Sequence, residues 1–172
     1  MSGISGAGAV RKSGEVGKFP ADHMIFIGSH VITSTGASTT GNSWTNTGLL
    51  YTVPSATAAK FSKIAIHWHN NFRINEGSGG THSFLYTALQ RIEPGTSISL
   101  SSATTDHRIG TQNHGGMDLF ADWTGNHIDT ALGSGDHTYK IQFNKGSNTY
   151  TNTVLHLGES NAKNHMILYG IV

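Results

Sequence analysis

A repeated two-residue alternation of apolar and polar side chains is the feature that most constrains how this chain folds. The clearest run, Phe61–Phe72, places apolar side chains on one face of an extended segment and polar side chains on the other. The apolar positions are Ile64, Ile66 and Trp68, and the polar positions are Lys63, His67 and His69. No stretch shows a convincing helical period. The sequence therefore predicts an all-β protein.

Eight to ten short extended runs follow one another, separated by turn residues such as Pro94-Gly95. They are Met24–Thr33, Ser43–Val53, Phe61–Phe72, Ser83–Arg91, Ile98–Leu100, Asp106–Thr111, Met117–Trp123, His137–Asn144, Thr149–Leu157 and His165–Val172. Short strands at this spacing are typical of sandwiches. We expect a two-sheet antiparallel jelly-roll-like sandwich spanning residues 22–172.

The inward positions of these runs define the expected core. Its members are Ile25, Ile27, Val31, Leu49, Ile64, Ile66, Trp68, Leu85, Leu89, Tyr139, Ile141, Phe143, Leu155, Leu157 and Leu168. The last run, His165–Val172, is apolar to its final position, so we expect a central or interface strand there.

Residues 1–21 are predicted to form an extended N-terminal arm. Met1–Lys18 is rich in Gly, Ser and Ala and cannot form a core by itself. We expect the arm to gain its contacts from another subunit or a neighbouring protein. The residues expected to make these assembly contacts are Met1, Ile4, Val10, Arg11 and Phe19.

The composition narrows the function classes. Only 12% of the residues are charged, against a usual share of roughly 25%, and the formal net charge is +1. The Lys and Arg residues are scattered along the chain, a pattern that predicts neither a groove that binds nucleic acid nor a basic patch that binds a membrane. With no cysteine, cysteine-ligated zinc and thiol nucleophiles are excluded. Low charge suits a surface covered by neighbours, and it equally suits an ordinary β surface with polar loops.

His67 and His69 are the candidate metal ligands. An H-x-H pair on a strand places both rings on one face, where a third ligand can complete a zinc or iron site. The pair is similar to that of the cupins, but Phe61 stands where those proteins carry a glycine, and Glu76 lies seven residues beyond His69. Three copies around a threefold axis could also enclose a metal. The simplest alternative to metal binding is that both histidines lie on a polar outward face beside Lys63. We therefore expect no cofactor.

Trp44 and Trp123 lie at or near predicted strand ends, where a ring can stack on a sugar. They are the candidate ligand-facing aromatic residues, although single aromatic residues in sandwiches are more often core or interface residues. No G-x-S-x-G elbow is present in the sequence.

Two stretches resemble a family of bacteriophage virion proteins, many from marine and cyanobacterial phages, whose jelly-roll modules occur in fibre-like and small structural proteins. The matching stretches are Trp44–Ile66 and Thr138–Val172. The motif residues are Thr47-Gly48-Leu49, Pro54-Ser55, Ser62-Lys63-Ile64, Thr138-Tyr139-Lys140-Ile141-Gln142 and Met166–Val172. The resemblance implies a homotrimer without catalysis. The chain departs from the family in lacking a shaft and in ending on Tyr169-Gly170-Ile171-Val172, where many relatives carry an acidic residue.

The resulting hypothesis is a non-enzymatic phage structural protein, made in the host cytoplasm and located in the virion. It would decorate or cement the capsid, or form a short fibre on the particle, as a homotrimer that contacts capsid or tail proteins. One alternative is a tail-fibre head that binds a host surface glycan. The other is a metal-dependent jelly-roll enzyme that uses His67 and His69. Neither nucleic acid nor membrane is an expected partner.

Overall fold

The computed structural model describes residues 23–33, 37–40, 43–75, 82–100, 109–112, 118–145, 153–157 and 164–172. The predicted arm, residues 1–21, lies outside the described residues, and so do its five expected contact residues. The structure describes the backbone of residues 153–157 but not their side chains, so the expected burial of Leu155 and Leu157 also lies outside what it describes.

The described chain is almost entirely β-structure, as the alternation predicts. The strands are β1 (Met24–Ile32), β2 (Ser38–Thr39), β3 (Thr45–Val53), β4 (Lys63–Asn75), β5 (His82–Glu93), β6 (Thr96–Ser99), β7 (Ile109–Gln112), β8 (Asp118–Asp129), β9 (His137–Lys145), β10 (Thr153–Leu157) and β11 (Asn164–Ile171). One helical turn, α1 (Ser55–Ala58), follows Pro54. No described helix is long and apolar enough to cross a membrane.

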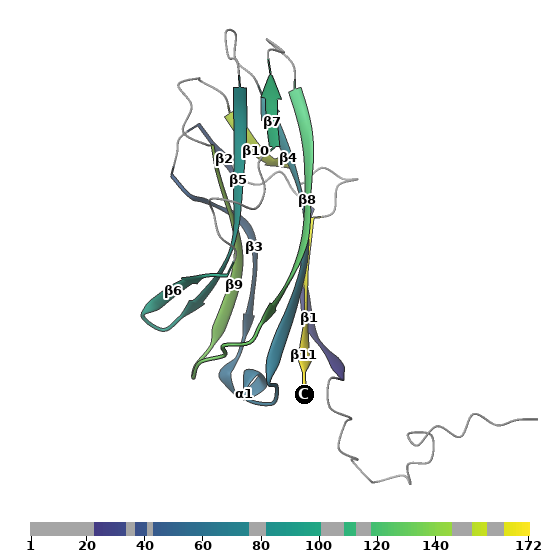
Figure 1. The fold of residues 1–172 in the computed structure, drawn as a ribbon, viewed down its shortest axis with the longest axis vertical. Coiled ribbons are helices and arrows are strands. Elements are labelled where there is room, and N and C mark those ends of the chain that lie inside the picture. The colour runs from purple at the N-terminus through teal and green to yellow at the C-terminus, as the bar shows by residue number, and fades with distance from the viewer. Residues whose placement is uncertain are drawn as a thin grey trace, which may run out of the picture.

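The strands form two antiparallel sheets that face each other (Figure 1). Sheet A has the order β1-β11-β4-β10-β2, with β8 on the other side of β4, and sheet B has the order β3-β9-β5-β6, with β7 also beside β5. The pairing is nested: β1 pairs with β11, β3 with β9, β4 with β8, and β5 with β6. A long hairpin rolled into two sheets gives this order, which is the jelly roll. The predicted fold class is confirmed.

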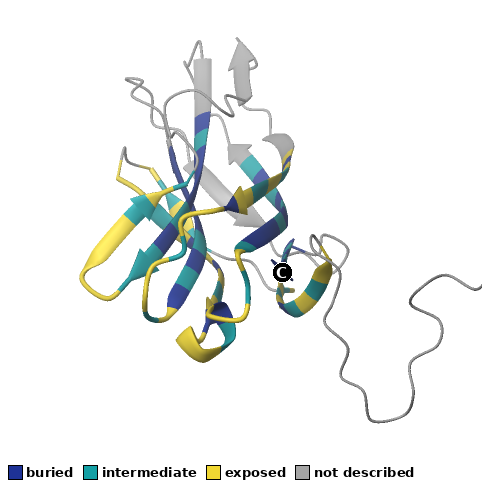
Figure 2. Cartoon of the chain, turned by 60° about the horizontal axis from the view of Figure 1, so that its bottom comes forward, coloured by how far each residue is buried: buried dark blue, intermediate teal, exposed yellow. Residues whose placement is uncertain are grey.

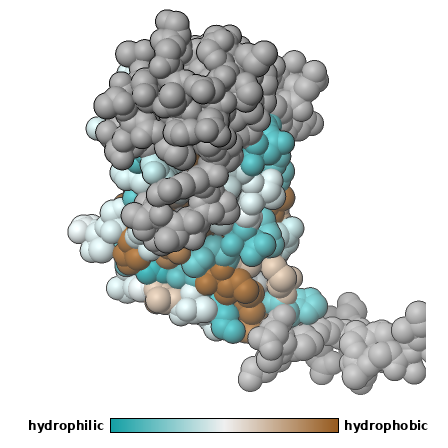
Figure 3. All heavy atoms as spheres, turned by 45° about the horizontal axis from the view of Figure 1, so that its top comes forward, coloured by the Kyte–Doolittle hydropathy of each residue, from teal (hydrophilic) through white to brown (hydrophobic). Residues whose placement is uncertain are grey.

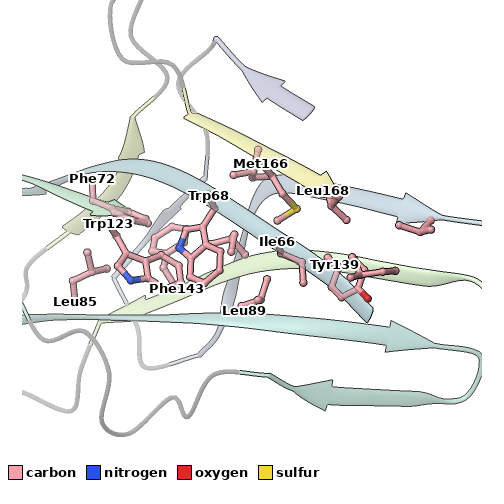
Figure 4. Packing of buried hydrophobic residues seen from close by; sticks show 14 of the residues in the cluster. Ile66, Trp68, Phe72, Leu85, Leu89, Trp123, Tyr139, Phe143, Met166 and Leu168 are labelled. Carbon is pink, nitrogen blue, oxygen red and sulfur yellow. The ribbon is translucent and has the colours of Figure 1, made fainter. Parts of the chain in front are cut away.

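The core lies between the sheets and is built mainly from β3, β4, β5, β9 and β11. Figure 4 shows Trp68 beside Trp123 and Phe72 beside Phe143, with ring centroids 5.0 Å and 5.4 Å apart. Predicted core residues that are buried are Leu49, Ile64, Ile66, Trp68, Leu85, Leu89, Tyr139, Ile141, Phe143 and Leu168. Buried hydrophobic residues that the prediction missed are Val53, Ala58, Ala65, Phe72, Ala88, Trp123, Met166 and Ile171.

Strand β1 departs from the predicted alternation. A register shift lies between Phe26 and Gly28, so one extra residue is inserted opposite β11. An inserted residue reverses which side chains face the core, because the side-chain period along a strand is two. Gly28 is therefore buried, whereas Val31 is 47% exposed and its predicted place in the core is wrong. Ile25 and Ile27 are only partly buried.

Burial follows the layers of the sandwich (Figure 2). Buried residues alternate with half-buried or exposed ones along the strands, and the turn between β5 and β6 is exposed. Aromatic rings fill the space above three strand glycines: Tyr51 over Gly28, Trp68 over Gly125 and Phe61 over Gly170. These glycines allow rings to pack directly on the backbone of sheet A.

Candidate functional site

His67 and His69 lie on β4 and face away from the core, as the alternation predicts. Their inward neighbours Ile66 and Trp68 are buried, while both imidazoles are half-buried on the outer face of sheet A. Strand β11 runs alongside, and the register places Ile167 opposite His67 and His165 opposite His69. The two candidate ligands therefore share one face with a third histidine.

Aromatic rings continue across this outer face. The rings of His69 and His165 are stacked with centroids 5.6 Å apart, and His69 Nδ1 lies 2.7 Å from Thr124 Oγ1 on β8. His67 and Tyr169 pack edge to face at 5.8 Å, and Tyr169 packs in the same way on Phe26 at 5.9 Å. The face is more apolar and aromatic than the polar outward sheet that the sequence suggested.

No group of three or more His, Cys, Asp or Glu side chains with metal-holding geometry occurs among the described residues. His67 and His69 consequently find no third ligand within the described part of one chain, and a metal there would need ligands from another copy. Metal binding stays a prediction. Elemental analysis of the purified protein, with and without His67→Ala, tests it.

The two tryptophans proposed as sugar platforms occupy different environments. Trp44 precedes β3 and is 36% exposed, so its ring is accessible. Trp123 is 2% exposed, and its assignment as a ligand-facing residue is wrong. Strand β8 extends six residues beyond the predicted end at Trp123, so this residue lies in mid-strand opposite Asn70 and packs inward on Trp68.

A buried polar cluster, which the sequence analysis missed, joins the two sheets. Arg91 contacts Asp129 across the sandwich, and its Nε lies 3.0 Å from Glu93 Oε1. The Tyr139 hydroxyl donates to Asp129 Oδ2 at 2.9 Å, and His137 Nδ1 lies 3.1 Å from Glu93 Oε1. We call these five residues the inter-sheet cluster. Glu93 is partly exposed and the other four are buried.

The electrostatics of the inter-sheet cluster are those of a buried structural network. Burial raises the pKa of Tyr139, and the charge and hydrogen bond of Asp129 raise it further. Burial lowers the pKa of Arg91, but the hydrogen bond and charge of Asp129, together with the charges of Glu93 and Tyr139, outweigh burial, so the pKa lies above its ordinary value. A sequence signal existed, because Arg91 continues the inward alternation of Leu85 and Leu89. An inward charge at that position requires a buried partner.

A hollow of about 430 Å³ lies at the α1 end of the sandwich. Its lining is mainly apolar: Ser55, Ala56, Ala58, Ala59, Phe61, Leu132, Gly133, Ser134 and Gly135. Ser55 N donates to Asp136 Oδ1 at 2.8 Å, which ties the loop after β8 to α1. Among the residues that the structure describes, no titratable side chain lines the hollow, so these residues offer shape and apolar contact without a group for acid–base chemistry.

Large apolar side chains are exposed in several places, and such residues appear as brown patches among polar atoms on the face drawn in Figure 3. The exposed large hydrophobic residues of the described chain are Met24, Phe26, Val31, Trp44, Leu50, Ile128 and Val172. Met24, Phe26 and Val31 come from β1 and Ile128 from β8, the two strands that flank β11 and β4 in sheet A. The outer face of sheet A is thus the main place where described apolar side chains meet solvent.

Comparisons with known proteins do not place the chain in a family. No family model matches the chain, and no curated protein matches it. Among solved structures, it is similar to a chain in the structure of the infectious bursal disease virus Gt strain, with 9% identity and a TM-score of 0.27. The match covers 92% of this chain and 46% of that chain, so this chain spans about half its length. A TM-score of this size does not establish a shared fold, and the function has to be argued from the residues.

Proposed function

We propose that the protein is a structural protein of a bacteriophage particle. It is a homo-oligomeric jelly-roll module, expected to be a trimer, that decorates or cements the capsid or forms a short fibre attached to the particle. It is non-enzymatic, is made in the host cytoplasm and resides in the virion. The observation that supports this proposal best is the apolar outer face of sheet A on a confirmed jelly roll.

The residues that carry the resemblance to phage virion modules shape the fold. Thr47 Oγ1 donates to Ile141 O and accepts from Leu49 N, both at 3.0 Å, where β3 changes register and Gly48 adopts a φ of +87°. A positive φ of this kind favours glycine. The motif therefore matches a local bulge needed by the sandwich, which supports the resemblance at the level of the module.

Two further motif positions close the α1 corner. Pro54 accepts backbone hydrogen bonds from Thr57 and Ala58, and so starts the helical turn. The backbone N and the Oγ of Ser62 both donate to Ile171 O, at 2.8 Å and 3.1 Å, fastening the start of β4 to the end of β11. These contacts serve architecture, which fits a protein whose task is mechanical.

The carboxylates with the best-defined partners also serve architecture. Asp129 is bound by Arg91, Tyr139 and the backbone N of Ala131, and Glu93 lies beside Arg91 and His137. A general acid or base has to reach a substrate. These groups are instead occupied between the sheets, and this supports the non-enzymatic part of the proposal.

Particle incorporation tests the proposal. Purified particles from an infection in which the gene is intact should contain the protein at a fixed copy number, measured by quantitative mass spectrometry. A variant lacking residues 1–21 should fold and oligomerise but be lost from particles, since the arm is proposed to contact a neighbouring virion protein. Absence of the full-length protein from particles would contradict the function. Normal incorporation of the shortened protein would contradict only the role of the arm.

Glycan binding is the second candidate function, and the exposed ring of Trp44 is the observation that favours it. The purified oligomer and a Trp44→Ala variant should be compared on a glycan array. Binding that disappears in the variant supports a receptor-binding head. No binding at high valency counts against it.

A further inference from the structure

One row of apolar side chains crosses sheet A on its outer face. Strand register places Phe26 opposite Tyr169, Tyr169 opposite Ala65, and Ala65 opposite Ile128. The row therefore runs from β1 through β11 and β4 to β8 without a charged side chain, and the Tyr169 hydroxyl is its one polar group. We call this set of four residues the apolar row.

The ends of the apolar row are open to solvent. Phe26 is 60% exposed and Ile128 is 53% exposed, although they lie on opposite edges of the four strands. Within the row Tyr169 is half-buried and Ala65 is buried, so the exposed apolar side chains lie at its two ends.

The next row on one side adds Met24, which is 48% exposed. The rows on the other side add the half-buried Ile167 and then Val31, which is 47% exposed. Large apolar side chains exposed together on one face of a folded protein mark a candidate interaction site.

The sequence of β11 fits coverage on both faces. Strand β11 reads Asn164–Ile171 with Met166 and Leu168 directed inward, and Ile167 and Tyr169 directed outward. A sheet with one solvated face alternates apolar and polar residues, whereas a strand covered on both faces is apolar throughout. Sheet B covers the inner face, so the composition of β11 calls for a second cover on the outer face.

The charge on this face suits contact with an identical surface. We consider the outward side chains of the four strands in the rows from Met24 to Val31. Only Lys63 among them carries a full charge, and it lies in the row of Met24 and Ile171, at one end of this surface. Contact between identical patches brings like charges together, which is costly at the centre of an interface. Here the centre is uncharged.

We propose that the outer face of sheet A, centred on the apolar row, is the contact between copies of this chain. The inference rests on the proposed homo-oligomer and names its interface, and a face packed on its own copy makes a twofold contact in place of the expected trimer. Four strands about 4.8 Å apart and about eight residues at a rise of about 3.3 Å give roughly 500 Å² per copy. Two such faces bury about 1,000 Å², the lower bound for a specific interface.

Residues 1–21 are the competing occupant of this face. Their sequence contains five glycines and the charged residues Arg11, Lys12, Glu15 and Lys18, so its large apolar residues are widely spaced. A second copy of the face supplies Phe26, Tyr169 and Ile128 again, which is the better match for an uncharged apolar row.

Charge insertion tests the interface. Phe26→Lys and Ile128→Lys place cations on the row, and Leu50→Lys is the matched control because Leu50 is 44% exposed but lies on β3 in sheet B. Size-exclusion chromatography with light scattering should give an oligomer for the wild type and the control. The protein concentration at which the oligomer dissociates should be at least about tenfold higher for the two row variants than for the wild type, because burying a charge in the interface is unfavourable. Thermal unfolding of each variant checks that it is folded.

Cysteine labelling gives a measurement that does not depend on breaking the oligomer. The chain has no cysteine, so Phe26→Cys, Ile128→Cys and Leu50→Cys each introduce a single thiol. Maleimide should label positions 26 and 128 at least about tenfold more slowly than position 50 in the native protein, and all three equally in denaturant. Equal native rates would overturn the proposal.

The outcomes separate the interface from the function. An oligomer that tolerates both lysine variants overturns the interface and leaves the oligomer intact. A wild-type monomer overturns both the interface and the oligomeric state, while incorporation into particles is still decided by mass spectrometry. Protection of positions 26 and 128 that disappears when residues 1–21 are deleted assigns the face to the arm and overturns the second copy as its occupant.

Discussion

The contact between Gly125 and Trp68 shows how tightly single residues are fitted in sheet A. A Cβ at position 125 would lie 2.3 Å from the Trp68 ring, well inside contact distance. Gly125→Ala should therefore lower the free energy of unfolding by about 1–3 kcal/mol, since the ring has to move within a packed core. Urea unfolding measures this loss. Asn126→Ala, at the exposed neighbouring position, should change stability by less than about 0.5 kcal/mol, and equal losses would contradict the prediction.

The raised pKa of Tyr139 predicts a loss of stability at alkaline pH. The folded state favours the neutral phenol, so this stabilisation is complete below the ordinary tyrosine pKa of about 10 and is lost as pH rises through the higher folded value. Above about pH 10 the free energy of unfolding should fall more steeply in the wild type than in Tyr139→Phe, by up to about 1.4 kcal/mol per pH unit. Urea unfolding from pH 8 to pH 11 gives both curves, and parallel curves would refute the assignment.

At the scale of single residues, alternation identified the core where strands are regular and failed where they are not. Ile64, Ile66 and Trp68 on β4 are buried as predicted. Val31 is exposed because the bulge after Phe26 shifts the phase of β1, and Gly28, a single glycine inside the run, is the sequence signal that the prediction did not use. Trp123 is buried because β8 continues past it, a property set by pairing with the long strand β4.

Among the elements, β5 and β8 are joined by the charged contact of Arg91 with Asp129. Arg91→Met should lower the free energy of unfolding by about 3–5 kcal/mol, because it leaves the carboxylates of Asp129 and Glu93 without their cation. Gln90→Met on the same strand is the control, since Gln90 is only half-buried and its described side-chain bond is an exposed one from Ser97. Chemical denaturation measures both. A similarly small loss in the two variants would show that the cluster does not hold the sheets together.

Most strand positions could be predicted from local pattern, but their ends could not. The prediction for β9, His137–Asn144, agrees with His137–Lys145 to one residue. The predictions near β6 and β7, Ile98–Leu100 and Asp106–Thr111, overlap those strands only partly, because short edge strands depend on the neighbour they pair with. Helix α1 was not predicted, since a single turn after Pro54 has no period to detect.

For the whole molecule, the sequence predicted the sandwich but not the inter-sheet cluster or the apolar row. Each sheet face depends on register between strands far apart in the chain, and periodicity within one strand does not contain that register. His67 and His69 were correctly placed outward, yet their neighbour His165 comes from β11 and becomes adjacent only when β4 and β11 pair. The same pairing creates the surface that we propose for self-assembly.

The nested pairing of strands also has a consequence for the order in which the chain can fold. Glu93 pairs with Thr96, three positions later, whereas Met24 pairs with Ile171, 147 positions later. Closing a long loop costs more entropy than closing a short one, and non-local pairing slows folding. The β5–β6 hairpin should form early and the β1–β11 pair last, after residue 171 has left the ribosome. A newly made chain therefore exposes Met24–Ile32 until β11 has been synthesised and has left the ribosome, and this strand is where ribosome-associated chaperones should bind.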